Sequence, residues 1–150
     1  MTNIEELAPD EALAKLLDKK VSVQTSATAS HVIRAYDEGS RPNKGLGNEF
    51  IEITWNGGAR SLTQPLGLYR GGLMLSVYVK TQDDGRAKKK LTKQIIAQCE
   101  KLVNNVSADG FFFKLDPNNV ITPTTVSLTT GYSTKILNVE WRVTDRIINN

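Results

Sequence analysis

Three segments of the chain alternate between hydrophobic and polar residues with a period of two: 50–55, 73–80 and 136–144. Such alternation is typical of β-strands that bury one face and leave the other face wetter. The positions that would share the buried face are Ile51, Ile53 and Trp55, then Leu73, Leu75, Val77 and Val79, and then Leu137, Val139, Trp141 and Val143. We therefore predict three strands that belong to one sheet.

Two further segments repeat their hydrophobic residues at helical spacing. The longer helix is expected over about 86–104, where the apolar stripe consists of Leu91, Ile95, Cys99, Leu102 and Val103. The shorter helix is expected over roughly 9–19, where the stripe consists of Leu13, Leu16 and Leu17. Pro9 suits a first helical turn, and the acidic residues Asp10 and Glu11 suit the positive end of the helix dipole. Both helices are amphipathic and are expected to pack through one face.

Glycine and small polar residues mark the connections. The Asn-Gly-Gly sequence at 56–58 is a tight-turn signal, so we predict a hairpin that returns through 60–63. The segment 37–48 contains three Gly and one Pro and is expected to be a long exposed loop. The segment 21–30 is expected to be a loop or an edge strand, and 32–36 a short strand.

Two more β segments are expected late in the chain, at 110–115 and 120–128, and Pro123 would place the second at a sheet edge or a bulge. This order of helices and strands favours an α+β fold. We predict a single domain over 1–150, with the helix at about 86–104 and the N-terminal helix packed on an antiparallel or mixed β-sheet. Its predicted core comprises Ile51, Ile53, Trp55, Leu75, Val77, Leu91, Ile95, Cys99, Leu102, Val139 and Trp141.

Composition excludes several classes of protein but does not indicate one function. The 150 residues are 39% hydrophobic and 23% charged, which is typical of a soluble globular domain. A single Cys and a single His exclude a disulfide scaffold and a Cys/His zinc site within one chain. No apolar stretch approaches the ~18 residues of a membrane helix, and the acidic N-terminus is unlike a secretory signal. We expect a protein of a reducing compartment with no membrane partner.

The excess of basic over acidic residues is concentrated in the middle of the chain. Residues 41–101 hold eleven basic and five acidic residues, including Arg86, Lys88, Lys89, Lys90 and Lys93. Cations at the start of a helix oppose its dipole, so helix stability does not explain this run. A solvated face and an interaction surface for acidic partners or DNA backbone both remain open. No aromatic residues are interleaved with the run, which argues against stacking on single-stranded nucleic acid.

No catalytic, cofactor or metal site can be assembled from the remaining residues. Cys99 lies on the apolar stripe of the long helix and is expected to be a small core residue. His31 has no neighbouring carboxylate or second His in the sequence and is expected at the surface. The Asp-Asp-Gly sequence at 83–85 is typical of a turn, and 44–47 lacks the spacing of a phosphate-binding loop. An enzyme is therefore the least favoured class.

The order of the predicted parts carries a resemblance. An N-terminal helix is followed by VIRAYDE at 32–38 and the strand FIEITW at 50–55. The strand YRGGLMLSVYV at 69–79 then leads through a Gly-containing turn into the long amphipathic helix, and ILNVEWRV closes the sequence of elements. This arrangement resembles the tail terminator (tail completion) proteins of long-tailed bacteriophages, the lambda-type group of small α+β ring formers, over about the whole chain.

The resemblance implies a structural role. Members of that family form hexameric rings that cap the tail tube, stop its polymerisation and present the surface that joins the filled head. We accordingly expect a virion protein at the head-proximal end of the tail, assembled in the host cytoplasm. The partners implied are other copies of the chain in a homo-hexameric ring, the tail tube protein, head–tail connector or neck proteins, and phage DNA passing through the lumen.

Two alternatives stay open. Within phage assembly, the chain would be a head–tail connector (neck) protein or a minor tail protein. In another class, it would be a small nucleic-acid-binding module that contacts phosphates without reading sequence.

Candidate residues for an interaction surface are chosen for expected exposure and charge. They are Lys88, Lys89, Lys90, Lys93, Arg86, Asn56, Gly57, Gly58, Lys44 and the 37–48 loop.

Overall fold

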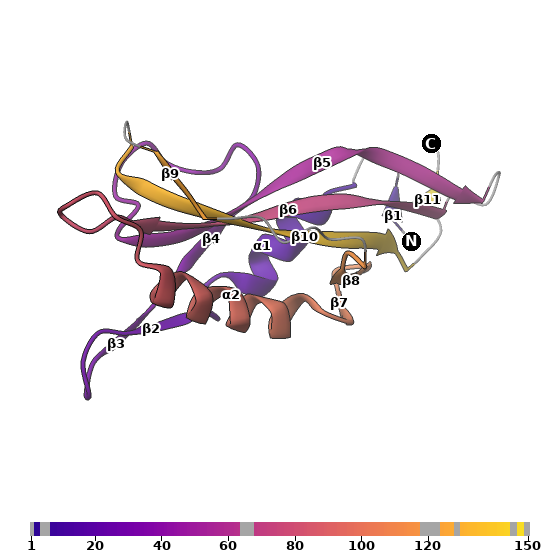
Figure 1. Cartoon of the computed structure of the whole chain (residues 1–150). Helices are drawn as coiled ribbons and strands as arrows, with labels where there is room; N and C mark the ends of the chain where they lie inside the picture. Colours follow the sequence, from indigo (N-terminus) through magenta and orange to yellow (C-terminus); the bar gives the residue numbers. More distant parts are fainter. Residues whose placement is uncertain are drawn as a thin grey trace.

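A seven-stranded mixed sheet carries both helices on one face (Figure 1). The computed structural model describes residues 2–3, 7–63, 68–117, 124–127, 130–144 and 147–148. The strands are, in spatial order, β4 (Arg34–Tyr36), β5 (Glu49–Thr63), β6 (Leu68–Lys80), β10 (Tyr132–Val143), β8 (Phe111–Leu115) and β7 (Val106–Ala108), with β9 (Thr125–Ser127) paired beside β8 on the same edge of β10. The pairing of β4 with β5 is parallel and the other pairings in this sheet are antiparallel.

The remaining elements flank this sheet. The helices α1 (Pro9–Leu17) and α2 (Lys89–Val103) cross its lower face in opposite directions (Figure 1). A separate hairpin of β2 (Ser22–Gln24) and β3 (Ser30–Val32) projects beside α2, and β1 (Thr2–Asn3) pairs in parallel with β11 (Ile147–Ile148). The α+β fold with both helices on the sheet is therefore confirmed.

The core lies between the sheet and the two helices. The alternating residues of β5, β6 and β10 point into it, and α1 and α2 cover them with their apolar stripes. Most predicted core residues are buried: Ile51, Ile53, Leu75, Val77, Ile95, Cys99, Val139 and Trp141. The others are half-buried at the margin of the core and pack against it: Trp55, Leu91 and Leu102.

Both helices are shorter than predicted. Helix α1 ends at Leu17, because Asp18 is extended and Lys19 has a positive φ of 62°. Helix α2 begins at Lys89, after a turn in which Arg86 N–H donates to Asp84 Oδ1 and Gly85 has φ of 84°. The basic residues at 86 and 88 thus precede the helix, and only the later lysines belong to it.

The hairpin predicted at 56–58 is wrong. Strand β5 continues from Glu49 to Thr63, and the register with β6 shifts between Asn56 and Arg60. Gly57 takes a φ of 83°, which a residue with a Cβ rarely adopts. The Asn-Gly-Gly sequence therefore forms a bulge within a long strand rather than a turn between two strands.

The sheet face opposite the helices holds a second, aromatic cluster. Phe50 is 1% exposed there, stacks on Tyr78 with ring centroids 4.6 Å apart, and meets Tyr36 and Tyr132 edge to face. The 37–48 loop is exposed for most of its length, as predicted, but it is tied across this cluster. The Tyr132 hydroxyl donates to the Gly47 carbonyl at 2.6 Å.

Arg41 provides the second tie of this loop. Its guanidinium lies 5.7 Å from the ring centroids of both Phe50 and Tyr78 and 3.6 Å from a carboxylate oxygen of Glu52. Burial raises the pKa of Tyr78 above its ordinary value, and nearby Glu52 raises it further, while Arg41 opposes the shift. The 37–48 loop thus crosses the aromatic cluster and is held on it at two points, and we call this loop the strap.

The late β segments agree in part with prediction. Strand β8 covers Phe111–Leu115, close to the predicted 110–115. Of the predicted strand at 120–128, Thr125–Ser127 forms β9 at the sheet edge. Pro123 lies outside the described residues.

Candidate interaction site

A large cleft opens between the β2–β3 hairpin, the start of β5 and the first turn of α2. Its volume is about 700 Å³. It is lined by Val23, Gln24, Thr25, His31, Asn48, Glu49, Gln82, Lys88, Lys89, Lys90, Leu91 and Gln94. We call it the basic cleft, because three consecutive lysines line it.

A buried carboxylate and the single histidine of the chain meet within this cleft. The Glu49 side chain is only 5% exposed, and its Oε1 lies 2.9 Å from Nε2 of His31, which is 44% exposed. An ionised carboxylate only accepts hydrogen bonds, so Nε2–H of His31 is the donor. His31 thereby satisfies a buried acid, which would otherwise be costly to bury.

The hairpin that forms one wall of the basic cleft is tied to α2. The side-chain amide of Gln98 donates to the carbonyl of Ser22 at 2.9 Å and accepts from the N–H of Ser22 at 3.0 Å. Val23 of the same strand is 5% exposed and packs into the core. Both contacts fix β2 beside the helix, and β3 follows by pairing with β2.

The three lysines of the basic cleft are exposed and have no ion-pair partner among the described residues. The first turn of α2 contains no acidic residue, and no side chain caps it. The positive end of the helix dipole and the charges of Lys88, Lys89 and Lys90 therefore add at one place. This arrangement lowers helix stability and creates a strongly positive surface.

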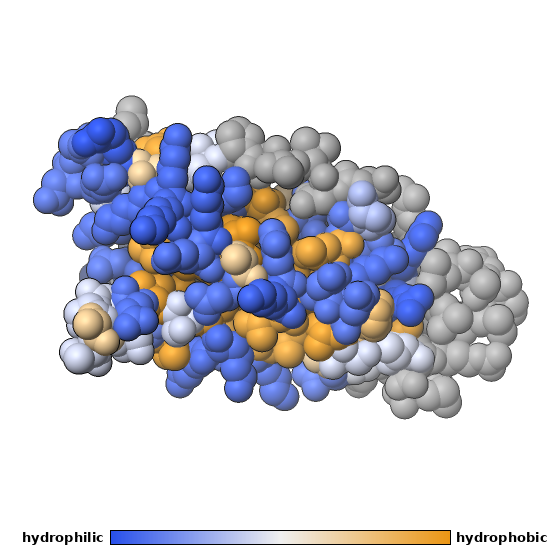
Figure 2. Space-filling model, turned by 60° about the horizontal axis from the view of Figure 1, so that its bottom comes forward, coloured by the Kyte–Doolittle hydropathy of each residue, from blue (hydrophilic) through white to orange (hydrophobic). Residues whose placement is uncertain are grey.

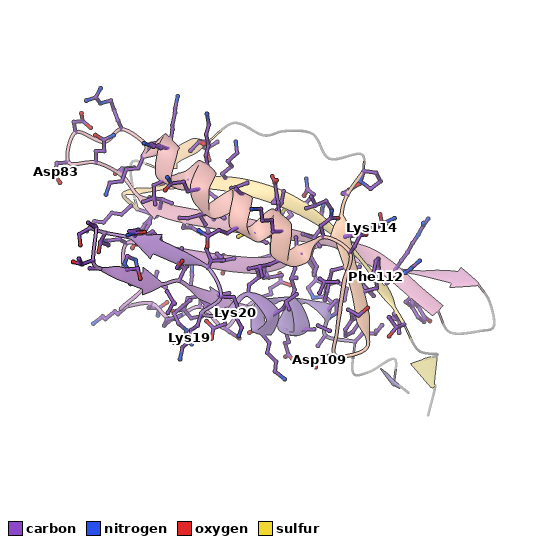
Figure 3. All side chains as sticks on the ribbon, turned by 90° about the horizontal axis from the view of Figure 1, so that it is seen from below. Lys19, Lys20, Asp83, Asp109, Phe112 and Lys114 are labelled. Carbon is purple, nitrogen blue, oxygen red and sulfur yellow. The ribbon has the colours of Figure 1, made fainter. Side chains whose placement is uncertain are left out.

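The other predicted contact residues do not lie together in the basic cleft. Arg86 pairs with Asp84 at 2.6 Å, and this hydrogen bond lowers the pKa of the Asp84 carboxyl below its ordinary value. Lys93 is exposed on α2 but does not line the basic cleft, and Lys44 is exposed in the strap. In Figure 3, Asp83 marks the tip of the loop that precedes α2, at the same end of the molecule as the basic cleft.

The bulge residues Asn56, Gly57 and Gly58 line a different cleft. Its volume is about 390 Å³, and its other lining residues are Arg70, Gly71, Gly72, Asp116 and Glu140. Charges of both signs are present there, so this cleft has no strong net potential. The predicted contact candidates thus lie on several separate surfaces, which include the basic cleft, this second cleft, the strap and an exposed part of α2.

Among the described residues that line the two clefts, His31 and Glu49 form the one contact between an imidazole and a carboxylate. Cys99 is buried in the core, and burial raises the pKa of its thiol to about 12, so it is an unreactive thiol near neutral pH. Among the described residues, no three His, Cys, Asp or Glu side chains are grouped so as to hold a metal ion. In the part of the chain that is described, no helix is long and apolar enough to cross a membrane.

Two contacts at the basic cleft could not be predicted from the sequence. Glu49 and His31 are 18 positions apart, and Gln98 and Ser22 are 76 apart. Neither pair lies within one helix or one hairpin, so no local spacing brings its members together.

Comparison with known proteins leaves the family open. No protein-family model matches the sequence, and no curated protein matches it. The fold is similar to a solved structure whose name states no function, with 13% identity, 73% of this chain and 77% of that chain covered, and a TM-score of 0.49.

Proposed function

We propose that this chain is a structural virion protein, a tail terminator that forms a ring on the last ring of a phage tail tube. The observation that carries the proposal is the arrangement of the segments that resemble that family. They form the three central strands β5, β6 and β10, with α2 lying across them. The segments that carry the family resemblance therefore form the centre of the domain rather than its edges.

The surface supports a protein that works by contact. The described residues offer a basic cleft, a second polar cleft and a strap over the sheet, but no activated nucleophile. In the proposed mechanism, one ring face repeats the interface that tube subunits offer each other and binds the last tube ring. The other face lacks that interface, so growth stops and the ring presents a surface to the head. Phage DNA would pass through its lumen.

A neck protein or a minor tail protein would also work by contact, so the experiment must measure tail length. The gene product is to be removed from its native phage, and the particles imaged. Overlong tails that fail to join heads are the expected result. Normal tails that join heads normally would overturn the proposal, whereas tails of normal length that fail to join would favour a neck protein.

A purified assay tests the same mechanism. Tail tube protein is polymerised with and without this chain, and tube lengths are measured by negative-stain microscopy. We expect short tubes capped at one end.

The unpaired lysines also favour a second candidate, the nucleic-acid-binding module. Its signature would be salt-dependent DNA binding by the isolated monomer. Rings that do not retain DNA would favour the terminator instead.

A further inference from the structure

The described surface contains a cluster of acids that complements the basic cleft. Asp10 and Glu11 lie in the first turn of α1, and Asp37 and Glu38 follow β4. The N–H of Glu38 donates to Asp10 Oδ2 at 3.3 Å, so the two segments are in contact. We call these four residues the acidic corner.

The four carboxylates of the acidic corner have no ion-pair partner among the described residues, just as the three lysines of the basic cleft have none. Asp10 is buried and accepts the indole N–H of Trp55 at 3.2 Å, so its role is structural. Glu11 and Glu38 are exposed and Asp37 is half-buried, so these three can face a partner.

The two charged surfaces lie apart on the molecule. Helices α1 and α2 run in opposite directions, so their first turns lie at opposite ends of the helical layer (Figure 1). Figure 2 shows this face, where hydrophilic residues surround the partly visible apolar core. A single copy therefore cannot neutralise its own basic cleft with its own acidic corner.

We infer that the acidic corner of one copy packs against the basic cleft of the next copy. Three exposed or half-exposed carboxylates would face three unpaired lysines, which matches the charges one to one. Contact between two different surfaces is a heterologous interface, and repetition of such an interface closes into a ring when the rotation allows it. This inference rests on the ring in the proposed function and names the surfaces that build it.

Two charge-reversed chains test the inference. The cleft variant carries Lys88→Glu, Lys89→Glu and Lys90→Glu, and the corner variant carries Glu11→Lys, Asp37→Lys and Glu38→Lys. The matched control carries Lys19→Glu, Lys20→Glu and Lys101→Glu, which change the same charge at exposed positions outside the cleft. Circular dichroism verifies folding, and light scattering after size-exclusion chromatography gives the mass.

We expect the wild type and the control to form the same assembly. Each reversed variant alone would place like charges together, and its association constant should fall by about tenfold or more at low salt. The difference should shrink as salt screens the charges. An equimolar mixture of the two variants should assemble again, because every contact in an alternating ring would then pair opposite charges.

The other outcomes overturn the inference. These are a wild type that stays monomeric at every concentration, a mixture that stays monomeric while the wild type assembles, or a cleft variant that assembles normally but loses DNA binding. The tube-length assay uses the wild-type chain, so the proposed function is judged separately. Capping without the predicted mixing behaviour would reject these surfaces and keep the terminator.

Discussion

Gly71 and Trp141 lie directly opposite each other on β6 and β10, and a Cβ at position 71 would come within 2.8 Å of Trp141 Nε1. The indole is fully buried and also meets Trp55 and Phe111 edge to face, each with ring centroids 5.7 Å apart. The glycine therefore provides the space in which the largest core side chain lies.

Gly71→Ala should destabilise the fold. The added methyl group must displace a fully buried indole, and such overpacking typically lowers the free energy of unfolding by about 1–3 kcal/mol. Urea denaturation measures the change. Gly58→Ala is the control, because a Cβ at Gly58 meets nothing within 4 Å and its φ is not positive. Equal stability of the two variants would contradict the close packing.

Ile53→Asp should abolish soluble expression. Ile53 is fully buried between the sheet and the helices, and an unpaired buried carboxylate costs several kcal/mol or more. The fraction of soluble protein after expression is the measurement. Thr54→Asp, at the next position on the opposite face of β5, should remain soluble. If both variants behave alike, the assignment of the buried face is wrong.

Cys99 should react with thiol reagents only when the protein unfolds. Its side chain is buried, and burial raises its pKa to about 12, so almost no thiolate exists at neutral pH. Labelling kinetics measured with increasing urea should follow unfolding, and Cys99→Ala should keep the proposed function. Fast labelling of the folded chain would reopen the enzyme class.

The same pKa shift predicts a dependence of stability on alkaline pH. In the unfolded chain the thiol loses its proton near pH 8.5, while in the folded chain it keeps it to about pH 12. The unfolded state therefore releases the proton first, and within this window the thiol lowers the free energy of unfolding by up to about 1.4 kcal/mol per pH unit. Below pH 8 the thiol contributes no pH dependence. Cys99→Ala should reduce the alkaline slope, and an unchanged slope would contradict burial of the thiol.

Arg41→Ala should release the strap over the aromatic cluster. The guanidinium lies over two rings and faces Glu52, and exposed cation–π contacts are worth about 0.5–1 kcal/mol each. We expect faster proteolysis within 37–48, identified by mass spectrometry, with a small loss of stability. Lys44→Ala, in the exposed part of the same loop, should leave the cleavage rate unchanged. The opposite ranking of the two variants would contradict the anchoring role of Arg41.

The faces of the central strands follow from the sequence because alternation is a local property. Leu73 and Leu75 point into the core as their spacing predicts. Phe50 does not follow from that reasoning, since it lies on the face that alternation assigns to solvent. It is buried there by rings from three other strands, β4, β6 and β10, and by the strap. Contacts of that kind depend on tertiary structure and leave no local signal.

The candidate site could likewise be predicted only in part from the sequence. The sequence predicts a charged surface at Lys88, Lys89 and Lys90, because no local energetic reason explains the run. It does not predict the cleft, whose other wall is a hairpin formed about 60 positions earlier and held by Gln98. The turn predicted at 56–58 is wrong for a related reason. The same glycines suit a turn or a bulge, and only the pairing of β5 with β6 decides between them.

The side-chain amide of Gln98 behaves as a surrogate peptide group. It offers one donor and one acceptor to Ser22, as a residue of a neighbouring strand would, so a helix takes part in sheet-type hydrogen bonding. Among charged or polar replacements of the same length, glutamate keeps the acceptor but loses the donor. One side chain on α2 thereby holds in place a wall of the basic cleft that belongs to the N-terminal third of the chain, although Gln98 itself does not line the cleft.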